Sequence, residues 1–253
     1  LLRRALPATV ADALAWDTLT REVGSFIDDD LADRHSDLLF SARMNGGTAL
    51  LYLLLEHQSA SDPDMPLRLL VYMVRVLERA RREKPGEKLP VVIPIVVSHA
   101  PGGWTAPRSL HALFEPDPRG IAGLAELVPG FTMVVEDLAR FSNDDIKHRA
   151  LGVFPQLAMW LLRDGREAGR LLASLGDWLE AFTRAAHEPT GVGALAQLLS
   201  YIAIVTDDLH LEVFRAKLAQ QAPEVARAAM TIAEQMRREG EAKGRAEGRA
   251  EGE

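Results

Sequence analysis

The sequence predicts an α/β fold in which helices flank a mixed sheet, followed by a mainly helical C-terminal subdomain. Two apolar, strand-like runs are joined by Asn45-Gly46-Gly47, and Asn-Gly is a strong hairpin signal because both residues accept positive φ. An amphipathic helical pattern then separates this hairpin from a β-branched run, which is the order of a crossover unit. After about residue 140 helical spacing dominates, so we expect the second half to be mainly helical.

The first 26 residues carry apolar side chains at roughly helical spacing, which predicts one or two short helices lying on a core. These side chains are Leu6, Val10, Leu14, Leu19 and Val23. The hairpin strands are expected at 36–44 and 49–58. In an antiparallel register closed at the Asn-Gly turn, the start of the first strand and the end of the second lie at the same end of the sheet.

Residues 67–82 are expected to form an amphipathic helix with an apolar inner face and a basic outer face. The inner face would consist of Leu69, Leu70, Met73, Val74 and Leu77. The outer face would consist of Arg68, Arg75, Arg79, Arg81 and Arg82. The β-branched run at 91–98 predicts a buried strand that returns to the same sheet, and residues 131–138 predict one more strand.

Helical patterns follow at 144–164, 166–187, 192–205 and 209–230. From Gly240 onward glycine recurs every fourth residue among charges of both signs, which indicates a low-complexity tail. We therefore expect a core domain over 1–140, a helical subdomain over 141–230 and a tail over 231–253. The tail is either a frayed helix that could join chains into a homo-oligomer or a disordered solubilising segment. Glycine costs a helix about 1 kcal/mol per position against alanine.

The composition bounds the chemistry and the compartment. The chain has 253 residues and no cysteine, so any bound metal is held by carboxylates, carbonyls, amides or histidines, which favours Mg²⁺ or Mn²⁺. A formal charge of -7 argues mildly against electrostatic coating of nucleic acid, although local patches matter more. No apolar run approaches the roughly 20 residues of a membrane span and no export signal opens the sequence, so we expect a cytoplasmic protein with no membrane partner. Because the sequence begins at Leu1 rather than at methionine, we expect a further segment before it.

Two carboxylates and an amide lie where the hairpin strands begin and end. Asp37 is near the start of the first strand, and Glu56 and Gln58 are near the end of the second. Residues two apart in a strand point to the same face, so Glu56 and Gln58 are expected to share one. Hydrolysis of a phosphodiester with hard cations needs converging carboxylates at about 2 to 2.3 Å from the metal and a group that positions water. Gln58 can orient water but cannot act as a charged base.

Four segments of the sequence form an ordered set. They are Ser-Asp-Leu-Leu-Phe (36–40), Leu-Leu-Leu-Glu-His-Gln-Ser (53–59), Pro-Leu-Arg-Leu-Leu-Val-Tyr-Met-Val-Arg (66–75) and Leu-Pro-Val-Val-Ile-Pro-Ile-Val-Val-Ser-His (89–99). Together they resemble the successive blocks of the recombination-promoting nuclease, or transposase, family of the PD-(D/E)XK superfamily. The similarity covers most of the chain. It implies a restriction-endonuclease-like core of α-β-β-β-α-β order, with glutamine in place of the usual lysine.

The resemblance also implies a site and an activity. Asp37 and Glu56 would bind Mg²⁺ or Mn²⁺, and Gln58 would take the third catalytic position. Arg68 and Tyr72, one helical turn apart, would contact the scissile phosphate of DNA. The implied function is that of a metal-dependent DNA endonuclease associated with recombination or mobile elements.

Each residue also has a structural interpretation. Glu56 ends an apolar run and could form a buried ion pair with Arg68 or Arg75, because a buried carboxylate needs a partner. Tyr72 could pack in the core. Four weaker candidates are interpreted first as structural residues: Asp28, His57, His99 and Asp137. For Asp137 the choice lies between an added site carboxylate and a strand-end turn residue.

Two further functions are compatible with the sequence. One is a catalytically inactive protein on the same fold that binds nucleic acid or oligomerises, with the acidic pair stabilising the hairpin. Position 58 bears on it, because glutamine makes a weaker case for catalysis than lysine. The other is an enzyme that acts on RNA or is a toxin against host nucleic acid, which would use the same site.

Overall fold

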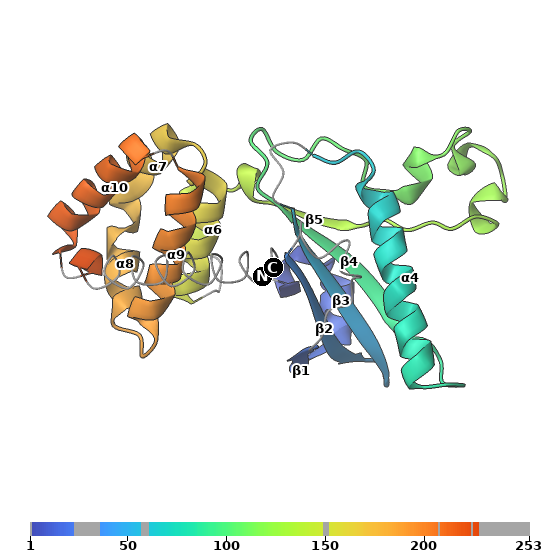
Figure 1. Cartoon of the computed structure of the whole chain (residues 1–253). Coiled ribbons are helices and arrows are strands. Elements are labelled where there is room, and N and C mark those ends of the chain that lie inside the picture. The colour runs from blue at the N-terminus through green and yellow to red at the C-terminus, as the bar shows by residue number, and fades with distance from the viewer. Residues whose placement is uncertain are drawn as a thin grey trace, which may run out of the picture. The chain divides into compact units, whose positions relative to one another are not determined.

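The computed structural model describes residues 2–22, 36–56, 61–148, 152–206, 208–223 and 225–227, with the backbone alone at 36–37, 52–56 and 208. The chain divides into two compact units, Leu1–Arg140 and Phe141–Glu253. The first contains a sheet with its covering helices, and the second is helical (Figure 1). No helix in this described part of the chain is long and apolar enough to cross a membrane.

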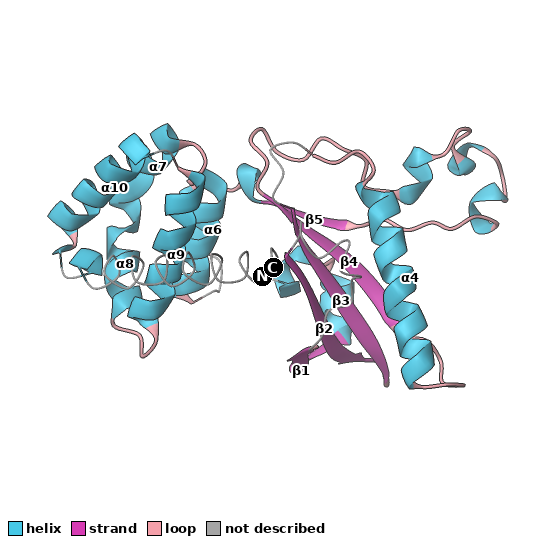
Figure 2. Ribbon diagram, viewed as in Figure 1, coloured by secondary structure: helices cyan, strands magenta, loops and turns pink. Residues whose placement is uncertain are grey.

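A five-stranded mixed sheet organises the first unit (Figure 2). In spatial order its strands are β1 (Leu14–Arg21), β2 (Ser36–Met44), β3 (Gly47–Glu56), β4 (Val91–Ser98) and β5 (Val134–Asp137). β1, β2 and β3 pair antiparallel, whereas β3, β4 and β5 pair parallel. Along the chain the elements run α2, β1, β2, β3, α4, β4, so the predicted fold class is confirmed.

The hairpin of β2 and β3 closes at the predicted turn. Asn45 and Gly46 have φ of 46° and 81°, and Met44 pairs with Gly47 across the turn. Two successive residues with positive φ give a two-residue turn whose twist matches that of the flanking strands. The turn therefore fixes the register of the whole hairpin.

The N-terminal segment begins with two short helices, as predicted, but residues 14–21 form a strand where helical spacing was expected. Residues 23–26 of the predicted range lie outside the described residues. The two short helices are α1 (Leu2–Ala5) and α2 (Ala8–Ala13). From Leu14 the chain extends into β1, which pairs with β2 through Leu14 and Met44. The free edge of the hairpin offers β1 a row of backbone hydrogen bonds, and this long-range pairing outweighs a loose apolar spacing.

Helix α4 (Met65–Glu83) crosses from β3 to β4 and packs on one face of the sheet (Figure 1). The core there consists of Leu39, Leu50, Met65, Leu69, Tyr72, Val76, Val96, Trp104 and Met133. The opposite face is buried as well, since Ala49, Leu51 and Ile95 have no exposed surface. On the N-terminal side, α1 contacts β5 and α2 contacts β1. The sheet is thus an interior layer.

The outer face of α4 is apolar as well as basic, which corrects the prediction of a basic face. Val74 was expected to face inward but is 44% exposed, in line with the exposed Leu67 and Val71. Arg68 and Arg75 were expected to face outward but are only partly exposed. The helix is rotated so that Leu69, Tyr72 and Val76 meet the sheet, and Arg68 lies in its first turns, which follow the end of β3 along the chain.

Short 3-10 helices shape the long connection between β4 and β5 and the chain that follows β5. They are η1 (Leu110–Leu113), η2 (Pro118–Gly120), η3 (Leu124–Glu126) and η4 (Leu138–Arg140). Ser109 bridges to Thr132, and the backbone N–H of Met133 donates to the carbonyl of Arg108. These bonds close the connection at its base, just before β5 begins.

The second unit is built from α5 (Asn143–Lys147), α6 (Val153–Asp164), α7 (Ala168–Ser174), η5 (Leu175–Trp178), α8 (Leu179–Ala186), α9 (Gly191–Val205) and α10 (Asp208–Gln221). The helix predicted at 192–205 is confirmed by α9, whereas the predictions at 144–164 and 166–187 each span more than one helix. At the centre, Trp160 and Trp178 stack with ring centroids 5.2 Å apart. The predicted tail at 231–253 lies outside the described residues.

Candidate active site

The carboxyl ends of β3, β4 and β5 meet at one edge of the sheet, because these strands are parallel. β2 is antiparallel to β3 and therefore starts at the same edge. Asp37 pairs with Leu54, two residues before Glu56, and Glu56 pairs with Ser98. Paired residues, and residues two apart, share a face of the sheet, so Asp37 and Glu56 occupy one face at this edge. Leu39 lies on that face and packs against α4.

For Asp37 and Glu56 the structure describes the backbone. The side chains of Asp37 and Glu56 are not described, and Gln58 lies outside the described residues, as do Asp28 and His57. Among the side chains that are described, no three of His, Asp and Glu are close enough together to hold a metal ion. The metal ligands and the third catalytic position therefore stay predictions from the sequence.

Arg68 and Tyr72 lie on the part of α4 that faces this edge. Arg68 forms an ion pair with Asp62, and its side chain is 23% exposed. Burial lowers the pKa of the Arg68 guanidinium, but hydrogen bonds with Asp62 and Tyr72 outweigh it and raise that pKa. Tyr72 is almost fully buried in the core cluster. The guanidinium of Arg68 therefore lies nearer to solvent than the phenol ring of Tyr72.

Asp137 joins the same edge, which the sequence did not favour. It is the last residue of β5, it pairs with Ser98, and it is 5% exposed. Its Oδ2 accepts hydrogen bonds from the backbone N–H of Trp104 at 2.8 Å and from Nε of Arg140 at 2.9 Å. His99, which follows Ser98, is buried. The available signal was a carboxylate at the end of a partly apolar run, Val134-Val135-Glu136-Asp137, which is weaker than the signal at Glu56, where the run of leucines is unbroken.

A second hydrogen bond holds the loop that follows β4. The backbone N–H of Thr105 donates to Oγ of Ser61 at 2.9 Å. Ser61 adjoins Asp62, the partner of Arg68. The loop after β4, the segment before α4 and the end of β5 are therefore connected to one another around the carboxyl edge.

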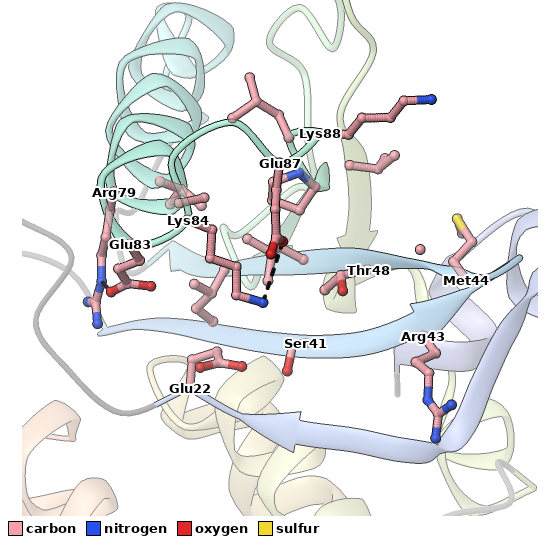
Figure 3. A pocket seen from close by; sticks show the side chains of 18 of the residues that line it. Glu22, Ser41, Arg43, Met44, Thr48, Arg79, Glu83, Lys84, Glu87 and Lys88 are labelled. Atoms are coloured by element: carbon pink, nitrogen blue, oxygen red, sulfur yellow. Dashed lines mark hydrogen bonds and ion pairs between the residues drawn. The ribbon is translucent and has the colours of Figure 1, made fainter.

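A charged groove of about 860 Å³ lies at the opposite edge, between the hairpin turn and the C-terminal end of α4 (Figure 3). The charged residues that line it are Glu22, Arg43, Arg79, Glu83, Lys84, Glu87 and Lys88. Several of these charges are already paired, with Arg79 and Glu83 at 2.5 Å and Lys84 and Glu87 at 3.9 Å. This groove is separate from the acidic pair. Met44, at the end of β2, and Val91, at the start of β4, line it, whereas Asp37 and Glu56 lie at the opposite ends of β2 and β3.

Comparison with known proteins gives consistent matches over most of the chain. It is 28% identical over 240 residues to recombination-promoting nuclease RpnD of Escherichia coli O157:H7, covering 91% of this chain and 85% of that protein. It is 27% identical over 237 residues to recombination-promoting nuclease RpnA of Escherichia coli K12, covering 93% and 77%.

A relative named as inactive is equally similar. The inactive recombination-promoting nuclease-like protein RpnE of Escherichia coli K12 is 28% identical over 239 residues, covering 93% of this chain and 75% of that protein. The search of solved structures gave no significant match. Residues 1–189 match the family described as "Putative transposase, YhgA-like". The chain therefore belongs to the YhgA-like transposase family, whose relatives include proteins named recombination-promoting nucleases.

Proposed function

We propose that this protein is a metal-dependent DNA endonuclease that hydrolyses phosphodiester bonds in recombination or in the movement of genetic elements. The observation that carries the proposal is the register of β2 and β3, which puts Asp37 and Glu56 on one face at the carboxyl edge. The names of the relatives RpnD and RpnA support the same activity. Asp37 and Glu56 would hold Mg²⁺ or Mn²⁺, since carboxylate oxygens suit these hard cations.

The residues would divide the chemistry as follows. When bound, the cation supplies charge neutralisation at the phosphate oxygens. The amide of Gln58 orients the attacking water through its donor and acceptor atoms. Arg68 contacts the phosphate of the DNA backbone, with Asp62 and Tyr72 holding its guanidinium in place. Tyr72 itself is too deeply buried to reach DNA, so its role is to position Arg68.

A nicking assay on supercoiled plasmid with Mg²⁺ tests the proposal. Wild type and the control Glu180→Gln are expected to nick the plasmid, whereas Glu56→Gln is expected to lose at least about a hundredfold in rate because a metal ligand is gone. Glu180 makes a good control because its side chain is 87% exposed in the second unit. Absence of cleavage by wild type with both Mg²⁺ and Mn²⁺ would count against the proposal.

The inactive relative RpnE favours one alternative, a protein that binds DNA on the same fold without cutting it. Fluorescence anisotropy with a labelled duplex in the presence of Ca²⁺ separates the two functions. Binding without cleavage in Mg²⁺, equal in wild type and Glu56→Gln, is the result expected of the inactive protein.

A further inference from the structure

Asp137 stands in the same cross-strand row as Glu56. Glu56 pairs with Ser98, and Ser98 pairs with Asp137, at the carboxyl ends of β3, β4 and β5. Asp137 is therefore on the sheet face that carries Asp37 and Glu56. Adjacent strands are about 4.8 Å apart, so the backbones of Glu56 and Asp137 are roughly 10 Å apart, with Ser98 between them.

The Asp137 carboxylate is buried, and only one of its oxygens is used. Oδ2 accepts hydrogen bonds from the backbone N–H of Trp104 and from Arg140. Oδ1 is buried and has no hydrogen-bond partner among the described residues. A buried polar atom without a protein partner is rare and costly, and a bound ion or water commonly satisfies it.

The loop after β4 fixes the carboxylate through Oδ2. Gly103 has φ of 84°, and a Cβ there would lie 2.9 Å from Asp137 Oδ2. Glycine at this position lets the backbone come close enough to direct the Trp104 N–H at Oδ2. Arg140 meets the same oxygen through a side chain that is 66% exposed. The protein thus holds Oδ2 in place, while Oδ1 has no hydrogen-bond partner among the described residues.

We propose that Oδ1 of Asp137 is a ligand for a divalent cation at the carboxyl edge, in the cross-strand row that Asp137 shares with Ser98 and the backbone of Glu56. The inference rests on the proposed nuclease function and adds a third carboxylate to its site. Cations of this kind take oxygen ligands at about 2.0 to 2.6 Å, which carboxylates two strands apart can provide to a point above the intervening strand. On the other side of the Glu56 backbone, β2 carries Asp37 on the same face, so the row of strand ends at this edge holds three carboxylate positions.

The competing account is that Asp137 only anchors the loop through Trp104 and Arg140. The two accounts differ in what Arg140 does to cation binding. If Asp137 holds a cation, the positive charge of Arg140 opposes it, because like charges repel. If Asp137 is an anchor alone, Arg140 acts on a cation at Asp37 and Glu56 only across a longer, screened distance, and its removal changes the affinity much less.

Calorimetry with Mn²⁺ on the full chain tests the inference without relying on activity. Asp137→Asn keeps the size of the side chain and is expected to weaken Mn²⁺ affinity at least about tenfold or to remove one binding event. Arg140→Ala is expected to raise the Mn²⁺ affinity severalfold. The exposed pair Asp117 and Arg119 supplies matched controls, Asp117→Asn and Arg119→Ala, which are expected to leave the affinity within about twofold of wild type.

Thermal unfolding with and without Mn²⁺ accompanies each titration. The rise in Tm caused by Mn²⁺ is expected to be smaller in Asp137→Asn than in wild type. Unchanged Mn²⁺ affinity in both Asp137→Asn and Arg140→Ala would overturn the inference while leaving the proposed nuclease intact. If wild type binds no Mn²⁺, the metal dependence of the proposed function fails as well. Should Asp137→Asn not fold, Arg140→Ala decides alone, because that side chain is exposed.

Discussion

Gly103→Ala is expected to destabilise the first unit much more than Gly102→Ala, although the two glycines are neighbours with nearly equal φ angles. Their φ angles are 84° and 83°, so alanine lowers the free energy of unfolding by about 1–2 kcal/mol at either position. Only at Gly103 would the new Cβ meet protein, 2.9 Å from Asp137 Oδ2. At Gly102 no atom lies within 4 Å of the added Cβ.

The additional loss at Gly103 follows from the hydrogen bonds of Asp137. To accommodate the Cβ, the loop or the Asp137 carboxylate must move. Either movement lengthens the hydrogen bond from the Trp104 N–H to Asp137 Oδ2. A hydrogen bond to a charged group contributes about 1.5–3 kcal/mol to stability. We therefore expect a total loss of about 3–5 kcal/mol for Gly103→Ala against about 1–2 kcal/mol for Gly102→Ala.

Urea unfolding at 25 °C, followed by tryptophan fluorescence and circular dichroism, measures both losses. Repeating the two substitutions in an Asp137→Ala background completes the test, because the excess at Gly103 is expected to disappear once the carboxylate is gone. Equal destabilisation by Gly102→Ala and Gly103→Ala in the wild-type background would refute the reasoning, since the contact with Asp137 would then carry no energy.

Two further predictions concern other ion pairs. Arg163→Ala is expected to lower the free energy of unfolding by about 1.5–3 kcal/mol, because it removes the guanidinium 2.6 Å from the buried carboxylate of Asp164, which Arg170 still meets at 3.2 Å. The exposed Arg184→Ala is expected to change that free energy by less than about 1 kcal/mol, and urea unfolding compares the two variants. Hydrogen bonds from the side chain and backbone of Arg119 lower the pKa of the Asp117 carboxyl from 3.8 to about 2. Because the pKa of Asp117 is lower in the folded state, the ionised carboxyl stabilises the fold above pH 3.8. This stabilisation is lost as the pH falls through about 2. NMR titration is expected to show that pKa and its return toward 3.8 in Arg119→Ala; a pKa that stays near 2 in the variant would contradict the cause.

The hairpin and the crossover could be predicted because their signals are local. Asn45 and Gly46 specify a turn by their φ preferences alone, and the turn then sets which residue of β2 faces which residue of β3. The position of Glu56 opposite the start of β2 follows directly. A β-branched run after a helix similarly predicts a parallel strand, as β4 confirms.

The remaining features depend on contacts distant in sequence. The strand β1 exists because the edge of β2 is free to pair with it, and nothing within residues 14–21 alone announces that partner. Asp137 resembled a turn residue because its burial comes from Trp104 and from the pairing of β5 with β4. The rotation of α4 was missed because arginine stems can lie along a core boundary while their charges pair nearby, as Arg68 does with Asp62.

The irregularity of β1 has a consequence for self-association. A regular edge strand presents an unbroken row of N–H and C=O groups that a strand from a second molecule can extend. In β1 the pairing with β2 shifts register between Ala15 and Thr20, and the Thr18 hydroxyl accepts from the N–H of Arg43 and donates to the carbonyl of Ala15. The pairing of β1 is therefore irregular, and the carbonyl of Ala15 is occupied by the Thr18 hydroxyl. Because a strand from a second molecule extends a regular edge more easily than an irregular one, we expect β1 to oppose edge-to-edge association of this leucine-rich sheet.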